Sequence, residues 1–167
     1  MLNQNESELI FNDDGSVYHL KLIPSNIADS IILVGDPQRV ELISKHFQSI
    51  EFSVTNREFK TITGIYKNKR ISVISTGIGS GNIDIVLNEL DSLVNIDFKT
   101  RKLKPKLTKL NLIRIGTSGA IQKDIPINSL LISSKGIDID GFLNNYKISN
   151  NHTYNEVNNY LNDYKFN

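Results

Sequence analysis

The chain contains no cysteine, so it has neither a disulfide framework nor a thiolate that can act as a metal ligand or a nucleophile. It also lacks any apolar run of membrane-spanning length. A formal net charge of +1 gives it no electrostatic hold on nucleic acid or on an anionic membrane. The first eight residues are polar and acidic, unlike a signal or transit peptide. We therefore expect a cytoplasmic protein whose partners include neither nucleic acid nor membrane.

The rest of the composition is that of a globular protein. Hydrophobic residues make up 39% of the 167 residues and charged residues 22%, which is usual for a folded domain. This length corresponds to one domain that can bury a core. The last 26 residues, 142–167, differ because nine of them are Asn. We expect a single domain over 1–167, in which residues 17–133 bear the motifs and residues 142–167 form a divergent tail.

Short apolar runs along the chain predict strands. The runs 31–34, 71–75 and 110–115 each predict a strand, and the first is too apolar to alternate, which is typical of a buried strand. The segment 50–66 alternates and predicts a hairpin that turns at about residues 56–60. A further strand is expected over 127–133.

Helical patterns follow two of these strands. Asp36 can cap a helix and Pro37 suits its first turn. A second helix is expected to begin near Asn82, with an apolar face made of Ile83, Val86, Leu87, Leu90 and Val94. Strands that alternate with helices indicate the α/β class with a parallel or mixed sheet.

The remaining segments give weaker signals. Residues 13–16 predict a turn, and residues 17–22 after them predict a short extended stretch. The Lys-rich segment 99–109 predicts an exposed connection. Apolar residues in the tail between Val157 and Tyr164 are spaced for a short amphipathic helix.

Three glycine-bearing loops come directly after predicted strands, at 35–39, 75–79 and 114–119. Ligands of α/β sheets bind beyond the carboxyl ends of strands. A phosphate site needs backbone N–H donors, a helix N-terminus and a fork-shaped cation, and two of these loops contain an arginine. Together the loops predict an oxyanion pocket at the rim of the sheet, although each one alone also fits a plain turn.

Arg114 is the most informative residue of these loops, because it lies inside an otherwise apolar strand. A buried arginine is costly unless it is paired with an anion, so we expect either a bound anion or a local carboxylate. Thr117 and Ser118 add hydroxyl donors beside it. The stretch 77–82 does not fit the dinucleotide fingerprint, since its third glycine would fall at Asn82.

The other polar residues predict little by position alone. Arg57 lies at the expected hairpin tip and reads as a solvated charge, and His19 reads as a half-buried histidine. The three histidines share no metal-like spacing, so we expect no metal site. No Ser-His-Asp set or pair of carboxylates can be defended.

Five short motifs, taken in their order and spacing, resemble the nucleoside phosphorylase-I superfamily, and within it the uridine phosphorylase-like branch. They are Val17–Leu20, Val34–Val40, Asn56–Phe59, Ser75–Gly79 and Arg114–Gln122. The resemblance implies a three-layer α/β/α fold around a mixed sheet that curls toward a barrel. It also implies an enzyme, a pentosyltransferase that cleaves a uridine-like pyrimidine nucleoside with phosphate to give the free base and ribose 1-phosphate.

The resemblance also assigns residues. Phosphate would be bound by Gly35, Arg39, Arg114 and Thr117, and by Arg57 from a neighbouring subunit. The nucleoside would be contacted by His19 of that neighbour, at the ribose 5′-hydroxyl, and by Ser118 and Gly119. Members of the family form homodimers, usually assembled into hexamers.

No cofactor beyond the co-substrate phosphate is implied. The pyrimidine branch can hold potassium between subunits near the position of Glu58, but Asn82 stands where those enzymes have a serine, which argues against the ion.

The chain departs from the family in its later part. Family members carry a Glu-Met-Glu motif that grips the ribose, followed by the residues that select the base, and no such motif occurs here. We therefore expect an incomplete nucleoside phosphorylase-like domain in which no catalytic residue can be firmly assigned. A nucleosidase that uses water, a purine-type enzyme and an inactive phosphate-binding remnant remain alternatives, and base preference and oligomeric state stay open.

Overall fold

The computed structural model describes residues 9–134, 136, 138 and 141–147. The chain divides into two compact units, Met1–Lys123 and Asp124–Asn167. The first unit contains the sheet and all residues that the sequence nominates for a site. In the second unit, the described residues include one 3₁₀ helix, η2 (Phe142–Asn145).

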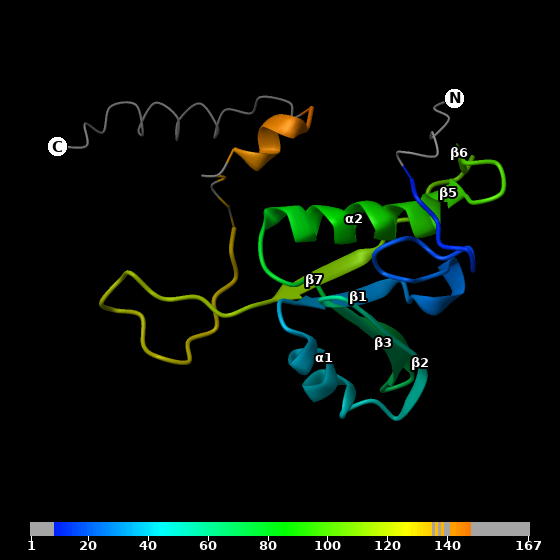
Figure 1. The fold of residues 1–167 in the computed structure, drawn as a ribbon. Helices are drawn as coiled ribbons and strands as arrows, with labels where there is room; N and C mark the ends of the chain where they lie inside the picture. The colour runs from blue at the N-terminus through cyan, green and yellow to red at the C-terminus, as the bar shows by residue number, and fades with distance from the viewer. Residues whose placement is uncertain (1–8, 135, 137, 139–140, 148–167) are drawn as a thin grey trace. The chain divides into compact units, whose positions relative to one another are not determined.

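A five-stranded mixed sheet forms the centre of the first unit (Figure 1). Its order is β2-β3-β4-β1-β7, with β1 parallel to both β4 and β7 and antiparallel pairing along β2, β3 and β4. The strands predicted over 31–34, 71–75 and 110–115 and the predicted hairpin are confirmed. Their bounds are β1 Ser30–Val34, β2 Ser49–Asn56, β3 Phe59–Tyr66, β4 Lys69–Ser75 and β7 Asn111–Ile115.

Two helices cover opposite faces of this sheet, α1 (Pro37–Ser44) on one side and α2 (Ser80–Asn95) on the other (Figure 1). Alternate residues of β1 face the two layers, as a strand requires. One buried cluster joins the sheet to α2 and includes Ile31, Leu33, Ile74, Val86, Leu90 and Leu93. The other joins it to α1 and consists of Val34, Val40, Ile62 and Val73. The expected three-layer α/β/α arrangement is thus confirmed.

The helix starts follow local chemistry. The carboxylate of Asp36 accepts a hydrogen bond of 2.8 Å from the backbone N–H of Gln38, so the predicted cap and start of α1 are confirmed. Helix α2 begins at Ser80, two residues before the predicted start, after Gly79 with φ of 99°. Its buried face differs from the predicted one, because Leu93 is buried and Leu87 is exposed.

The segment 17–22 is a compact turn rather than the predicted extended stretch. The N–H of Lys21 donates to the carbonyl of Val17 at 3.0 Å, and Lys21 has φ of 51°. Val17, Leu20 and Leu22 are all fully buried. Residues 17 and 20 would lie on opposite sides of a strand, so only a turn can bury these three side chains in one core.

β7 is exposed, which overturns the prediction that Arg114 is buried. β7 is the edge strand of the sheet, and among the described residues it pairs only with β1. Arg114 is exposed, and Ile113 keeps 64% of its surface accessible. An apolar run therefore predicted this strand correctly but not its place at the edge, because the sheet order is set by the other strands.

Three other predictions concern segments outside the main sheet. Residues 127–133 form no strand in the structure, and Leu130 and Ile132 are each 99% exposed. The segment 99–109 includes part of a small hairpin of β5 (Ile96–Asp97) and β6 (Lys102–Leu103), which the sequence did not predict. The predicted tail helix lies outside the described residues.

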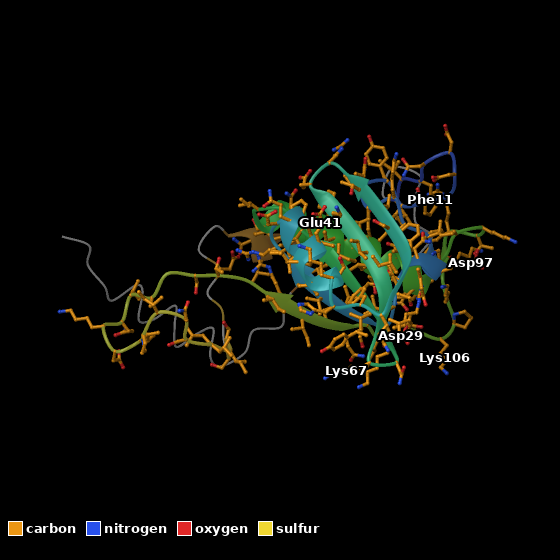
Figure 2. The ribbon with its side chains drawn as sticks, turned by 90° about the horizontal axis from the view of Figure 1, so that it is seen from below. Phe11, Asp29, Glu41, Lys67, Asp97 and Lys106 are labelled. Carbon is orange, nitrogen blue, oxygen red and sulfur yellow. The ribbon has the colours of Figure 1, made fainter. Side chains whose placement is uncertain are left out.

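Side chains are drawn on this framework in Figure 2, where Glu41 lies on α1 and Asp97 in β5, just after the C-terminal end of α2. Within the described part of the chain, no helix is both long and apolar enough to cross a membrane.

Candidate functional site

Three parallel strands end at one edge of the sheet and deliver the three glycine-bearing loops there. β4, β1 and β7 are neighbours and run in the same direction, so the loops after Ser75, Val34 and Ile115 all start from the same edge. The N–H of Thr76 donates to the carbonyl of Val34 at 2.7 Å and ties two of these loops together. The structure thus brings together the loops that the sequence nominated.

Arg39 and Thr117 meet at this edge from segments far apart in the chain. Arg39 lies in the first turn of α1, and its Nη2 donates to Oγ1 of Thr117 at 3.3 Å. Thr117 is the second residue after the end of β7. The hydrogen bond spans the site from the β1 loop to the β7 loop.

The guanidinium of Arg114 lies along two of the loop glycines. A Cβ atom on Gly116 would stand 2.9 Å from its Nη1, and a Cβ atom on Gly35 would stand 4.0 Å from its Nη2. A side chain at position 116 would displace the guanidinium, so glycine is what lets this cation lie against the backbone. Arg39 and Arg114 therefore point toward the same rim, close to Gly35 and Thr117.

The rim holds two arginine side chains. Among the described residues, neither Arg39 nor Arg114 forms an ion pair with a carboxylate. Of the two acidic residues nearest to Arg39 in the sequence, Glu41 pairs with Lys60, and the carboxylate of Asp36 accepts from the N–H of Gln38 at the start of α1. Two guanidinium groups, a threonine hydroxyl and the start of a helix make an arrangement suited to an oxyanion.

Gly77 shapes the middle loop. It has φ of +67°, and a Cβ atom there would stand 2.7 Å from Nδ2 of Asn82 and 2.8 Å from Cγ of Glu58. Glu58 belongs to the turn between β2 and β3, so this turn packs against the loop after β4. In the described part of the chain, no group of three or more His, Asp or Glu side chains is placed to hold a metal ion.

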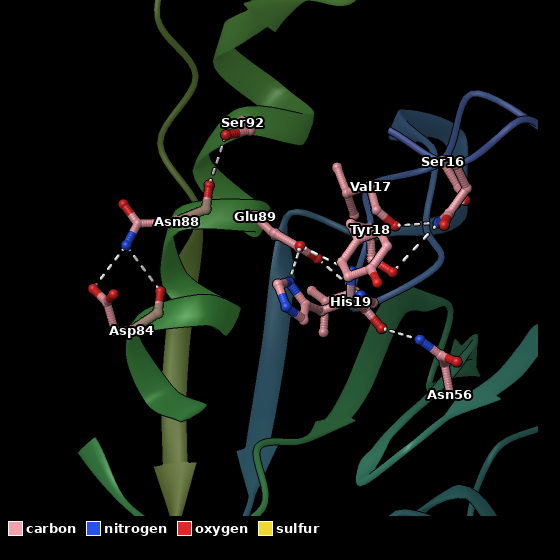
Figure 3. A network of polar contacts seen from close by, with 11 residues as sticks. Ser16, Val17, Tyr18, His19, Asn56, Asp84, Asn88, Glu89 and Ser92 are labelled. Carbon is pink, nitrogen blue, oxygen red and sulfur yellow. Dashed lines mark hydrogen bonds and ion pairs between the residues drawn. The ribbon is translucent and has the colours of Figure 1, made fainter. Parts of the chain in front are cut away.

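A second group of polar residues is centred on His19. Oε1 of Glu89 accepts from the backbone N–H of His19 at 2.9 Å and contacts its Nδ1 at 2.7 Å (Figure 3). Nδ2 of Asn56 donates to the carbonyl of His19 at 2.7 Å. Arg57 follows Asn56, is exposed, and lies with its guanidinium carbon 5.7 Å from the ring centroid of Tyr18.

The nominated residues thus fall into two groups. Gly35, Arg39, Arg114 and Thr117 lie together, and Ser118 and Gly119 continue from them in exposed positions. His19 and Arg57 lie in the other group, and no contact between Arg57 and Arg39 or Arg114 is found in the described residues.

Glu89 is the polar residue that the sequence reading missed. It is only 8% exposed and lies on the buried face of α2, three residues after Val86 and four before Leu93. The available signal was a glutamate spaced along the sequence so that it falls on the apolar face of the helix. Such a buried carboxylate is rare unless it is paired, so its position indicated a partner. Its partner lies 70 residues away, which no local pattern predicts.

The sheet, its two helical layers and the loops at its carboxyl edge define an α/β protein with a candidate anion site. The sequence model of the phosphorylase superfamily matches residues 29–165. The chain therefore belongs to the phosphorylase superfamily.

Individual relatives include enzymes for both kinds of base. The uridine phosphorylase of Thermococcus kodakarensis is 34% identical over 134 residues, which cover 80% of this chain and 43% of that enzyme. The DeoD-type purine nucleoside phosphorylase of Bacillus thuringiensis is 37% identical over 116 residues, which cover 69% of this chain and 44% of that enzyme. The chain thus spans less than half the length of these curated relatives.

A solved structure of a nucleoside phosphorylase is also similar to this chain in its fold. A nucleoside phosphorylase from Trypanosoma brucei that shows uridine phosphorylase activity superposes with a TM-score of 0.65 at 37% sequence identity. The match covers 71% of this chain and 41% of that one.

Proposed function

We propose that the protein is a nucleoside phosphorylase that cleaves a pyrimidine nucleoside such as uridine with inorganic phosphate. The products are the free base and ribose 1-phosphate. The proposal rests on one observation, the convergence of Arg39, Arg114 and Thr117 at the rim where three parallel strands end. The named uridine phosphorylase relatives support a pyrimidine substrate, and the purine nucleoside phosphorylases keep inosine as the comparison substrate.

The geometry suits the chemistry. A phosphate oxygen attacks the anomeric carbon of the ribose, the glycosidic bond breaks, and its electron pair leaves with the base. The transition state is a ribosyl oxocarbenium with positive charge at the anomeric carbon. Phosphate held by Arg39 and Arg114 is both the nucleophile and the counter-charge, so positioning and electrostatics supply the rate.

The proposed site is shared between two copies of the chain. His19 and Arg57 form their own group, in which Arg57 is exposed at the turn between β2 and β3. In the proposed homodimer these two residues enter the site of the neighbouring copy, where Arg57 reaches phosphate and His19 reaches the 5′-hydroxyl of the ribose. Ser118 and Gly119 line the nucleoside beside Thr117.

The test is base release from uridine and inosine by the folded full chain, with and without phosphate. Release that requires phosphate, and is faster with uridine, is the expected result. Release without phosphate would make the protein a nucleosidase. Thermal stabilisation by phosphate with no release from either substrate would make it a phosphate-binding remnant. The absence of both responses would overturn the proposed site.

Replacing Arg114 with glutamine tests the phosphate site without relying on turnover. A ligand present at 100 times its dissociation constant stabilises the folded state by about 2.7 kcal/mol. We expect phosphate to raise the melting temperature of the wild-type chain and to lose most of this effect in Arg114→Gln, because the fork-shaped cation is gone. Differential scanning fluorimetry of both proteins over a series of phosphate concentrations measures this shift in melting temperature.

Lys109→Gln is the matched control. It removes the same charge from an exposed residue shortly before β7. We expect its phosphate response to equal that of the wild type. If Arg114→Gln and Lys109→Gln respond alike, phosphate stabilises the protein by general screening and the assigned site is wrong.

A further inference from the structure

Glu89 is a buried carboxylate, and within the described part of the chain its hydrogen bonds all go to one turn. Oε1 accepts from the backbone N–H of His19 at 2.9 Å and contacts Nδ1 of the same residue at 2.7 Å, and Oε2 accepts from the N–H of Leu20 at 2.8 Å (Figure 3). Burying a carboxylate is costly unless such donors satisfy it. Two of the three bonds hold the backbone of the turn, and the third holds the imidazole ring.

The third bond determines which nitrogen of His19 carries the proton. An ionised carboxylate can only accept hydrogen bonds, so Nδ1 must be the donor. In a neutral imidazole the other nitrogen, Nε2, then has a free lone pair and is an acceptor. No hydrogen bond to Nε2 is found in the part of the chain that the structure describes, and the side chain of His19 is 28% exposed.

Neighbouring groups hold the ring in one orientation. The ring of Tyr18 meets that of His19 edge-on, with centroids 4.9 Å apart, and Phe59 packs on it at 6.3 Å. Asn56 fixes the backbone carbonyl of His19. The imidazole is thus constrained at its backbone, at Nδ1 and by neighbouring rings, and Nε2 remains for a ligand.

We propose that Glu89 is a positioning residue that keeps the proton of His19 on Nδ1, so that Nε2 accepts a hydrogen bond from a hydroxyl group of the bound nucleoside. The identity of this ligand rests on the proposed function. The protonation state of His19 does not, and it can be measured in the absence of any substrate.

Glu89→Gln has nearly the same shape but cannot make the same three bonds. An amide presents one oxygen and one NH₂ group. If its oxygen accepts from His19, its NH₂ faces the N–H of Leu20. If its NH₂ instead donates to Nδ1, the proton of His19 must move to Nε2. We therefore expect the variant to shift His19 toward the Nε2-protonated tautomer.

Long-range ¹H–¹⁵N correlation spectra of the histidine rings report the tautomer directly. They are recorded at about pH 8.5, about two units above the ordinary histidine pKa. The signal of His19 is assigned by elimination, using one variant without His46 and one without His152. Asp91→Asn is the control, because Asp91 is an exposed carboxylate of the same helix that accepts from Asn95 at 2.7 Å.

We expect the wild type and Asp91→Asn to show His19 protonated on Nδ1, and Glu89→Gln to show the Nε2-protonated form or a mixture. A wild-type His19 protonated on Nε2 would overturn the inference, and so would a tautomer unchanged in a folded Glu89→Gln. If Glu89→Gln does not fold, the wild-type spectrum decides alone, because it needs no substitution at the site.

Kinetics add a readout that a purely structural role would not move. With uridine, Glu89→Gln should raise KM by about three- to tenfold, which is the range for one neutral hydrogen bond. It should lower kcat by less than this factor. With 5′-deoxyuridine, which lacks the hydroxyl, the same substitution should change KM little. Equal effects on both substrates would overturn the hydroxyl contact.

The two proposals fail in different ways. Cleavage of neither uridine nor inosine, with the expected tautomer in place, overturns the proposed function and leaves Glu89 as the group that sets the proton of His19. An active phosphorylase whose His19 is protonated on Nε2 overturns the role of Glu89 and leaves the proposed function standing.

Discussion

Arg114 reaches the candidate site because of where it lies on its strand. It is the penultimate residue of β7, and it pairs in register with Leu33 of β1, the neighbouring strand. From there its guanidinium lies along Gly35 and Gly116. The sequence reading inferred an anion from burial, whereas the structure gives an exposed arginine with no ion-pair partner among the described residues. An exposed, unpaired arginine stays available to a soluble anion at little desolvation cost.

At the residue scale, Gly77 offers a test of the loop that follows β4. Its φ of +67° costs an alanine about 1–2 kcal/mol. The new Cβ atom would also crowd the side chains of Asn82 and Glu58. We expect Gly77→Ala to lower the free energy of unfolding by about that amount, as measured by urea denaturation.

Gly81→Ala is the matched control for this substitution. Gly81 lies in the first turn of α2, and a Cβ atom there would meet nothing within 4 Å. Alanine is favoured over glycine in a helix by roughly 0.5–1 kcal/mol, so this variant should be as stable as the wild type or more so. If both variants had the same stability, the strain assigned to Gly77 would be disproved.

At the element scale, the sequence predicted what depends on local pattern. The apolar run before Gly35 predicted β1, and Asp36 with Pro37 predicted the start of α1, because capping and periodicity act within a few residues. It did not predict that β7 is an edge strand or that 127–133 forms no strand. Both depend on which strands lie alongside, and a chain segment does not encode its neighbours locally.

In the candidate site, too, the sequence predicted what depends on local pattern and missed what depends on contacts between distant segments. Gly35, Arg39 and Thr117 could be nominated because loops at the carboxyl ends of parallel strands share one edge of a sheet. Glu89 could not be assigned to His19, since the two are joined only when α2 packs over the turn at 17–22. Because residues 17–22 were expected to be extended, the sequence did not predict the contact between His19 and Glu89.

The cap of α1 is the element whose stability bears most directly on the rim. Asp36→Ala removes the acceptor for the N–H of Gln38. Loss of such a cap costs about 1 kcal/mol, and we expect the free energy of unfolding to fall by that amount. Because Arg39 lies in the same first turn, phosphate stabilisation should weaken too.

Asp36→Asn is the control for the cap, since asparagine is an equally good N-cap residue. Its stability in urea should stay close to that of the wild type. A loss in Asp36→Asn as large as that in Asp36→Ala would show that the charge of Asp36, and not its hydrogen bond, stabilises the helix start.

At the scale of the whole molecule, three exposed carboxylates make the fold sensitive to acid. The Ser16 hydroxyl and N–H lower the pKa of Asp14, and the hydrogen bond and charge of Lys60 lower the pKa of Glu41. The backbone N–H groups of Thr100 and Lys99 lower the pKa of Asp97. Glu41 and Asp97 lie far apart on the fold (Figure 2), so we expect their contributions to be independent.

The sign of the pH dependence follows from these shifts. Each group has a lower pKa folded than unfolded, so below the ordinary carboxyl pKa values of about 3.9–4.3 the unfolded chain binds more protons than the folded one. Their contribution to stability is complete above those values and is lost as the pH falls through the lower, folded values. We expect the free energy of unfolding, measured in urea at a series of pH values, to decrease below about pH 5.

The variant Asp97→Asn tests one of these groups, because an asparagine at this position does not titrate. The difference in free energy of unfolding between the wild type and Asp97→Asn should therefore become smaller as the pH falls. Parallel curves for the two proteins would mean that the bonds from Lys99 and Thr100 do not favour the ionised form of Asp97.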